Sequence, residues 1–339
     1  MKILLISPLV KSINPDTKYA GIEKLVWEYA KELSNSNNVN VWGRDDSTYP
    51  DGVTVYPTKV FEEPFIMAEL RQYQEQGYTL RSYDVVHDFS HQHFASRYNH
   101  KLKSLSLFWH APATGRIPKS PYNIIAPSEW ACREFQRVYR QQARYVQSIV
   151  VDGEVYKPGG KRGDRFVTMG IMTPDKGNLS AITLCKELGL PLDVVGARGK
   201  DKDAPMDDYE RAIHSFCDGK QIRYLGEVSH EEKLKIMQEC RALIYVQRTG
   251  EVTSHKTQEF MLCGAPVICS TAGALPEIVT HGVDGYLCSS EEEFKRALKD
   301  VDNLTPEKKM EETREKYSVR TVTSEYLKLY QEVAGGRSW

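Results

Sequence analysis

The feature that most constrains this chain is the alternation of short β-rich runs with helical patterns from its first residue onward. In the first half the β-rich runs are KILLISP, VNVWG, VTVYP, DVVHDF, SLSLFWH, NIIAPS and QSIVV. Helical patterns, such as residues 22–33 with apolar positions three and four apart, lie between several of them. This strand, helix, strand order predicts a parallel, doubly wound sheet.

The second half repeats this architecture after a Gly- and Pro-containing linker at residues 151–164. Its expected strands are RFVTMG, LDVVGA, QIRYLGE, RALIYVQ, APVICS and DGYLC, and its expected helices are residues 179–188, 209–216, 231–239 and 257–263. A last helix at about 322–332 has an apolar stripe that must be buried. We therefore expect two facing Rossmann-like domains, residues 1–155 and 156–318, followed by a last helical segment at residues 319–339.

The composition excludes several classes of protein. Lys and Arg number 45 against 46 Asp and Glu, with no strongly basic half, which argues against a nucleic-acid partner. Apolar runs stay well short of the roughly 20 residues of a membrane span, and the start MKILLISPLV is interpreted as a core strand. The seven cysteines form no C-x-x-C pair, which favours buried thiols in a reducing cytoplasm.

The strongest candidate site is the segment GEVTSHKTQEFMLCGAPV, which contains Glu251 and Glu259. Thr253 or Ser254 can cap the helix that carries Glu259, and a helix start favours a phosphate. The two carboxylates can accept hydrogen bonds from sugar and ribose hydroxyls. Two solvated glutamates are the plainer alternative. A glycosidase pair fits poorly, because eight helical residues span about 12 Å and that mechanism needs roughly 5 to 9.5 Å.

This segment resembles the retaining GT-B glycosyltransferases of the glycogen-synthase-like group known as family 4, in which Glu-x7-Glu runs into a Cys-Gly-Ala-Pro-Val strand. Other pieces agree in their order along the chain: AGIE at 20–23, DVVH at 84–87, FWH at 108–110, APSEW at 126–130, VDGEVYKP at 151–158, MGIMTPDKG at 169–177, VG at 195–196, YLG at 224–226 and AGALPEI at 272–278. The resemblance covers nearly the whole chain, including a last helix that crosses back onto the first domain.

The resemblance implies roles for the residues of the second domain. Glu251 would contact the donor sugar and Glu259 the ribose hydroxyls, while Lys176 would pair with the diphosphate beside Gly170. A lysine and helix-terminal amides can stabilise a departing diphosphate without a metal.

In the first domain, the resemblance places Gly21 in a loop whose backbone approaches the phosphates, and His110 at the reaction centre on the donor sugar. Taken alone, Gly21 is equally typical of a tight turn, and a strand-end histidine such as His110 is more often structural. The family's retaining chemistry proceeds on one face of the sugar, so no protein nucleophile is expected.

One departure from the family pattern concerns the diphosphate. The family usually has Gly-Arg before the Lys-Gly pair, whereas Ile171 follows Gly170 here. Arg248, three residues before Glu251, is the candidate to supply the missing cation from the neighbouring strand end.

The segment His87-Asp-Phe-Ser-His91-Gln-His93 has two interpretations. A His-x-His pair on a strand can bind a metal. The preferred interpretation is that His87, His91 and His93 form a wall of the acceptor or donor site, with no metal and no cofactor required.

Four arginines, at positions 133, 137, 140 and 144, recur at steps of four, three and four. On a predicted helix over 129–145 they would share one face. Arg133, Arg137, Arg140 and Arg144 would then form either a solvated face or a peripheral contact with the anionic inner face of a membrane.

The sequence thus predicts a retaining glycosyltransferase that moves a sugar from a nucleotide sugar, with uridine favoured, to a hydroxyl acceptor. One alternative is a weak or inactive sugar-nucleotide-binding protein of the same fold, for which Ile171 is the reason. The other is an NAD(P)-dependent oxidoreductase, which is disfavoured because no G-x-G-x-x-G follows either domain's first strand.

Overall fold

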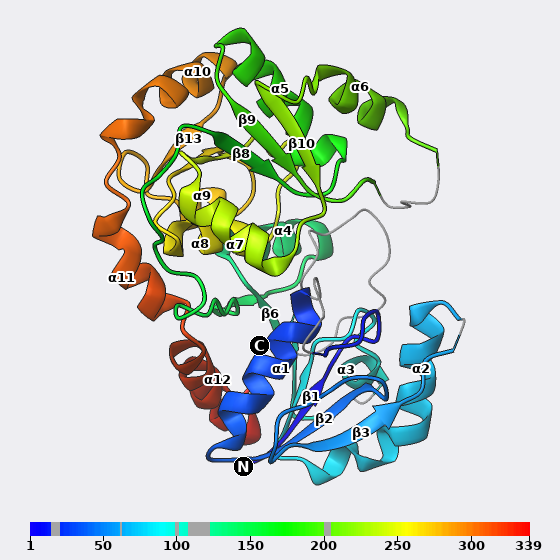
Figure 1. Ribbon diagram of the computed structural model, residues 1–339. Helices are drawn as coiled ribbons and strands as arrows, with labels where there is room; N and C mark the ends of the chain where they lie inside the picture. The colour runs from blue at the N-terminus through cyan, green and yellow to red at the C-terminus, as the bar shows by residue number, and fades with distance from the viewer. Residues whose placement is uncertain (15–20, 62, 99–101, 108–122, 200–204) are drawn as a thin grey trace. The chain divides into compact units, whose positions relative to one another are not determined.

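The computed structural model describes residues 1–14, 21–61, 63–98, 102–107, 123–199 and 205–339, and the chain divides into two units (Figure 1). Unit 1 comprises Met1–Val150 and Tyr317–Trp339, and unit 2 comprises Val151–Lys316. The sequence analysis placed these limits at residues 155 and 318. None of the described helices is long and apolar enough to span a bilayer.

Unit 1 contains a seven-stranded parallel sheet with the order β3-β2-β1-β4-β5-β6-β7. The strands are β1 Lys2–Ile6, β2 Asn38–Arg44, β3 Thr54–Thr58, β4 Val85–Asp88, β5 Ser104–Leu107, β6 Ile124–Ala126 and β7 Arg144–Tyr145. The first six strands have the order of a doubly wound fold, whose direction reverses between β1 and β4.

The described helices of unit 1 are α1 Gly21–Ser34, α2 Phe65–Gln76, the 3-10 helix η1 Gly77–Ser82, α3 Phe94–Tyr98, α4 Glu129–Tyr139 and α12 Val319–Ala334. The apolar stripe predicted for the last helix is buried along α12, where Val322, Tyr326, Leu329 and Tyr330 join the core formed by β1, β4 and α1. The end of the chain therefore completes the core that its beginning starts, as α12 beside α1 shows in Figure 1.

Unit 2 contains a six-stranded parallel sheet with the order β10-β9-β8-β11-β12-β13. The strands are β8 Phe166–Met169, β9 Leu192–Val195, β10 Ile222–Gly226, β11 Leu243–Tyr245, β12 Val267–Ser270 and β13 Gly285–Cys288. All six expected strands are present. The order is again doubly wound, with its reversal between β8 and β11.

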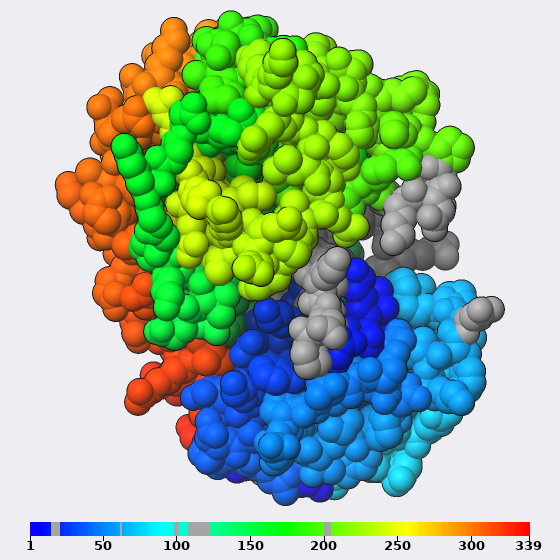
Figure 2. All heavy atoms as spheres, viewed as in Figure 1, coloured from blue at the N-terminus to red at the C-terminus, as the bar shows by residue number. Residues whose placement is uncertain are grey.

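Helices follow the strands of unit 2: η2 Pro174–Lys176, α5 Asn178–Glu187, α6 Asp208–Phe216, α7 His230–Glu239, α8 His255–Leu262, α9 Leu275–Ile278, α10 Glu291–Asp300, η3 Val301–Asn303 and α11 Glu307–Lys316. In Figure 2 α10 and α11, drawn in orange, lie at the surface of this unit, and α10 buries Phe294, Ala297 and Leu298 in its core. The four predicted helices are α5, α6, α7 and α8.

One predicted strand of unit 1 is wrong. The run QSIVV at 147–151 pairs with no strand, and the edge strand lies earlier, at β7. The backbone carbonyl of Ser148 accepts a hydrogen bond from the Tyr29 hydroxyl at 2.8 Å, and its own hydroxyl shares one with Tyr326 at 2.6 Å. The segment is buried beneath α1 and α12, and side chains of these two helices form its hydrogen bonds. Its β-rich composition does not reveal these contacts.

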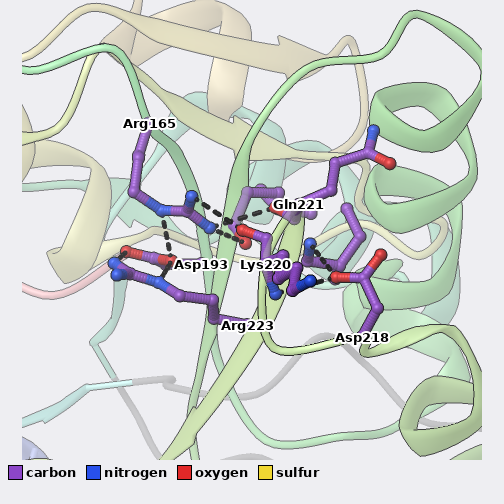
Figure 3. A network of polar contacts seen from close by, with 8 residues as sticks. Arg165, Asp193, Asp218, Lys220, Gln221 and Arg223 are labelled. Carbon is purple, nitrogen blue, oxygen red and sulfur yellow. Dashed lines mark hydrogen bonds and ion pairs between the residues drawn. The ribbon is translucent and has the colours of Figure 1, made fainter.

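A charged network fixes the amino ends of β8, β9 and β10 (Figure 3). Arg165 donates from Nε to Asp193 Oδ1 at 2.7 Å, and Arg223 donates to both oxygens of the same carboxylate at 2.7 and 2.6 Å. Arg165 also donates to the carbonyls of Leu192 and Gln221 at 2.9 and 3.0 Å. Since the Asp193 side chain is only 9% exposed, two cations compensate for its burial.

We predict that Asp193→Ala lowers the free energy of unfolding by about 3 kcal/mol, because it leaves two partly buried guanidinium groups without their carboxylate. Urea denaturation measures this change. Asp302→Ala is the control, since it removes the exposed partner of Arg241 and should cost under about 1 kcal/mol. Equal effects of the two substitutions would contradict the structural role of Asp193.

Candidate functional site

The candidate site of unit 2 lies where β8 and β11 end, beside the reversal of strand order. Gly170 follows β8 and Gly196 follows β9, with φ of 152° and 145°. A Cβ on Gly196 would lie 2.0 Å from the carbonyl oxygen of Gly170. The backbone segments after β8 and β9 therefore approach at a distance that only glycine allows. Ligands of doubly wound sheets bind in the crevice at this type of edge.

Glu251 is held by two elements of unit 2. It forms an ion pair with Lys176 at the end of η2, and the Tyr245 hydroxyl at the end of β11 donates to its Oε2 at 2.6 Å. The side chains of Lys176 and Glu251 are each 25% exposed. Burial lowers the pKa of Lys176, but the carboxylates of Glu251 and Asp175 outweigh this effect, so its pKa lies above the usual value. The lysine is therefore charged at neutral pH.

The backbone of Glu251 is fixed by the segment before α9. Ala274 donates its N–H to the Glu251 carbonyl at 3.0 Å. Gly273 has φ of 63°, and a Cβ there would lie 2.4 Å from the Glu251 nitrogen. The AGALPEI segment thus positions the carboxylate from behind.

Glu259 lies on α8 and faces α7. Its Oε2 is 2.7 Å from Lys233 Nζ, and its side chain is 14% exposed. Burial raises the pKa of Glu259, but Lys233 and the Tyr156 hydroxyl together outweigh burial and hold that pKa below 4.5. Glu259 is therefore an ionised carboxylate on α8 at neutral pH.

Ser254 is the residue before α8, as expected, but its hydroxyl does not cap the helix. The Ser254 Oγ instead shares a hydrogen bond with the Thr257 hydroxyl at 2.8 Å. The Ser254 carbonyl accepts from the Thr257 N–H at 3.1 Å. The N–H groups of His255 and Lys256 come before that bond and are not capped by the Ser254 side chain, which suits the oxygens of a phosphate.

Arg248, whose role on the diphosphate stays a prediction, is joined near this edge of the sheet by a second cation, Lys256. Arg248 is exposed, and its guanidinium donates to the Ser180 hydroxyl at 3.1 Å. Ile171 is 41% exposed. The ammonium of Lys256, a residue that the sequence analysis did not select, lies 3.3 Å from the position of a Cβ on Gly170.

In unit 1, His87 does not form a wall of a site, which corrects the prediction for this residue. It is fully buried, its Nδ1 shares a 2.7 Å hydrogen bond with the Tyr330 hydroxyl, and its ring lies 3.9 Å from that of Phe89. Burial lowers its pKa well below 6.5, so it is a neutral core residue. The helix α12 covers it, which a local sequence pattern cannot show.

His91 and His93 contact different carboxylates. His91 Nδ1 lies 3.4 Å from Glu69 Oε1, and His93 Nδ1 lies 3.8 Å from Asp88 Oδ1. Among the described residues no three His, Cys, Asp or Glu side chains are grouped as metal ligands. The wall role of His91 and His93 stays a prediction.

His110 and Gly21 are the two other site residues predicted for unit 1. His110 lies outside the described residues. Gly21 begins α1 and is exposed, and a Cβ at this position would meet nothing within 4 Å. The protein's own packing therefore does not require glycine there.

The four arginines of residues 133–144 do not share one helix face, which corrects the predicted helix over 129–145. The helix α4 ends at Tyr139 because Arg140 adopts a left-handed φ of 57°, and Arg144 lies in β7. All four nevertheless line one hollow of about 690 Å³, together with Arg337 and Trp339. Arg144 and Arg337 both bond to Glu332, at 2.8 and 2.9 Å.

Residues 160–319 match the family described as Glycosyl transferases group 1. This range lies almost wholly within unit 2. Unit 2 therefore matches this family along most of its length. No curated protein sequence matches the chain.

The whole chain is similar in structure to solved glycosyltransferases. AviGT4, involved in avilamycin A biosynthesis, is 21% identical with a TM-score of 0.71, covering 100% of this chain and 99% of that one. HepE from Anabaena in complex with UDP is 16% identical with a TM-score of 0.74, and the match covers 98% of this chain and 100% of HepE. Sucrose-phosphate synthase from Thermosynechococcus elongatus is 14% identical with a TM-score of 0.79, and the match covers 99% of this chain and 100% of the synthase. The fold is therefore GT-B. This fold and the match to Glycosyl transferases group 1 together support the conclusion that the protein is a glycosyltransferase.

We predict that Glu259→Gln lowers the free energy of unfolding at pH 7 by roughly 2 kcal/mol, because it leaves Lys233 without its carboxylate. Since the pKa of Glu259 is lowered on folding, its contribution is complete above pH 4.5 and is lost as the pH falls through the folded-state pKa. Denaturant titrations should show that wild type and Glu259→Gln differ less in free energy of unfolding at pH 4 than at pH 7. A constant difference would contradict the ion pair.

Proposed function

We propose that this chain transfers a sugar, with retention at the anomeric carbon, from a uridine diphosphate sugar to a hydroxyl acceptor, without a metal. The observation that carries the proposal is the position of Lys176 and Glu251 at the edge where β8 and β11 end, next to the start of α8. A cation, a hydroxyl-binding carboxylate and helix amides are the groups that a sugar diphosphate needs.

The proposed chemistry depends on the charge of the leaving group. As the glycosidic bond breaks, the diphosphate gains negative charge, and Lys176 with the α8 amides stabilises it. In the free protein Lys176 is paired with Glu251. The diphosphate would compete for the lysine, and Glu251 would then turn its free oxygen to the sugar hydroxyls while Tyr245 keeps the other.

Retention follows in this proposal from the resemblance to family 4. The departing phosphate oxygen would take the proton of the acceptor hydroxyl on the same face of the sugar, so the protein supplies position and charge instead of a nucleophile. The donor base is proposed by likeness, since the solved structure of HepE contains UDP. The acceptor would bind to unit 1, in the cytoplasm.

A second candidate function is binding of the sugar nucleotide without turnover. The exposed Ile171 favours it, because an apolar side chain stands where the family has a cation on the diphosphate. The two candidates differ in product formation, and not in nucleotide binding.

A thermal-shift panel tests the donor site. With UDP at 100 times its dissociation constant, the stability should rise by about 2.7 kcal/mol, which corresponds to roughly 5 to 10 °C. The shift should survive a chelator. The panel includes GDP, ADP, NAD and uridine, and a shift with NAD alone, or with nothing, would contradict the proposal.

We further predict that Lys176→Met weakens UDP binding at least tenfold, because it removes a charged partner of the diphosphate, worth roughly 1.5 to 3 kcal/mol. Lys235→Met, on the exposed face of α7, is the matched control and should leave affinity unchanged. Isothermal titration calorimetry measures both. Equal affinities would exclude Lys176 from the site.

The arginine hollow of unit 1 is proposed as the peripheral contact with an anionic membrane surface. Five arginines line it. Glu134 pairs with Arg137, and Glu332 pairs with Arg144 and Arg337. Each basic residue near an anionic surface adds about 1 kcal/mol of binding.

Vesicle flotation with phosphatidylserine-containing vesicles tests this contact. Arg133→Gln with Arg140→Gln should reduce binding roughly tenfold or more, whereas Lys24→Gln with Lys328→Gln, of equal charge change on exposed faces of α1 and α12, should reduce it little. Binding that does not depend on anionic lipid would remove the proposal.

A further inference from the structure

Lys256 occupies a position that helix electrostatics disfavour. It is the second residue of α8, directly after His255, and the start of a helix carries a partial positive charge. A lysine in this turn gains nothing from the helix. Departures from a local rule of this kind concentrate at functional sites.

The contacts of Lys256 direct its ammonium into the candidate site. Its Nζ donates to the Met169 carbonyl at 2.6 Å and lies 3.4 Å from the centre of the Tyr245 ring. Met169 ends β8 and Tyr245 ends β11, so the ammonium lies where the strand order reverses. The carbonyl and the ring both accept a cation, but neither neutralises it.

Two lysines lie beside the same glycine. A Cβ on Gly170 would meet Lys256 Nζ at 3.3 Å and the Cγ of Lys176 at 3.8 Å. Lys176 is already paired with Glu251, whereas the hydrogen bond of the Lys256 ammonium goes to a carbonyl. Of these two lysines, Lys176 is neutralised by Glu251, whereas no carboxylate among the described residues bonds directly to the ammonium of Lys256.

The charged groups around Lys256 come from three elements. Glu251 and Asp175 favour its ammonium form, as does Glu259 on α8, while Lys176 opposes it. Burial is the largest effect, and the pKa of Lys256 is lowered to about 7. The residue as a whole is only partly buried, whereas its ammonium group is desolvated.

We propose that Lys256 supplies the second cation on the donor diphosphate, from α8, in place of the cation that Ile171 cannot provide. This inference rests on the proposed donor site. A diphosphate beside Gly170 would add the full negative charge that the carbonyl and the ring lack, and the first turn of α8 favours the same anion. Binding the diphosphate would then bring a proton onto Lys256.

Calorimetry at pH 8 tests the inference, because the phosphate groups are fully ionised there. Titrations of UDP in two buffers of different ionisation enthalpy give the number of protons taken up. We expect net proton uptake with UDP and none with uridine, and an affinity that falls as the pH rises from 7.5 to 9.

Three variants separate charge from packing. Lys256→Met should bind UDP at least tenfold more weakly at pH 7 and take up no proton. Lys256→Arg keeps a permanent cation, so it should bind UDP without proton uptake. Lys235→Met should behave as wild type. The melting temperature of unliganded Lys256→Met should not fall, because methionine removes a desolvated cation, and this shows that the variant is folded.

The outcomes distinguish this inference from the proposed function. If the wild type binds no nucleoside diphosphate, the donor site itself is wrong. If the wild type binds UDP and Lys256→Met binds it equally, with the same proton uptake, the role of Lys256 is overturned and the donor site stands.

Discussion

The candidate site depends on the parallel pairing of β8 and β11. Because both strands run in the same direction, their carboxyl ends lie at one edge of the sheet, and the chain beyond them leads to η2 in one case and to α8 in the other. Lys176, Glu251 and Lys256 are more than 70 residues apart at their extremes, yet this pairing gathers them around Gly170. Gly170 leaves space for the two lysine side chains, and Gly196 allows the end of β9 to approach Gly170.

The charges of the site are arranged at a cost to the free protein. Lys256 stands against the helix dipole, and Lys176 is occupied by Glu251. In the proposed donor site, a bound diphosphate would offset the unfavourable position of Lys256, which is a trade of stability for function. The network of Asp193 at the opposite ends of β8, β9 and β10 has no such conflict, since two arginines surround one buried carboxylate.

Local patterns were sufficient for most of the fold. The strand pattern of RFVTMG and the apolar stripe of α12 each follow from residue type and spacing alone. The end of α4 at Arg140 did not, because a left-handed arginine has no sequence signal comparable to glycine. The burial of His87 depends on α12, which is distant in sequence. The family resemblance pointed to Lys176 and Glu251 as candidates. It did not point to Lys256, although a lysine in a first helical turn was the available signal.

The most direct test of the central claim is a crystal structure of this chain with UDP. The account predicts the diphosphate next to Gly170, with oxygens within hydrogen-bonding distance of the ammonium groups of Lys176 and Lys256 and of the first amides of α8. UDP bound elsewhere, or bound with its phosphates away from both lysines, would contradict the account.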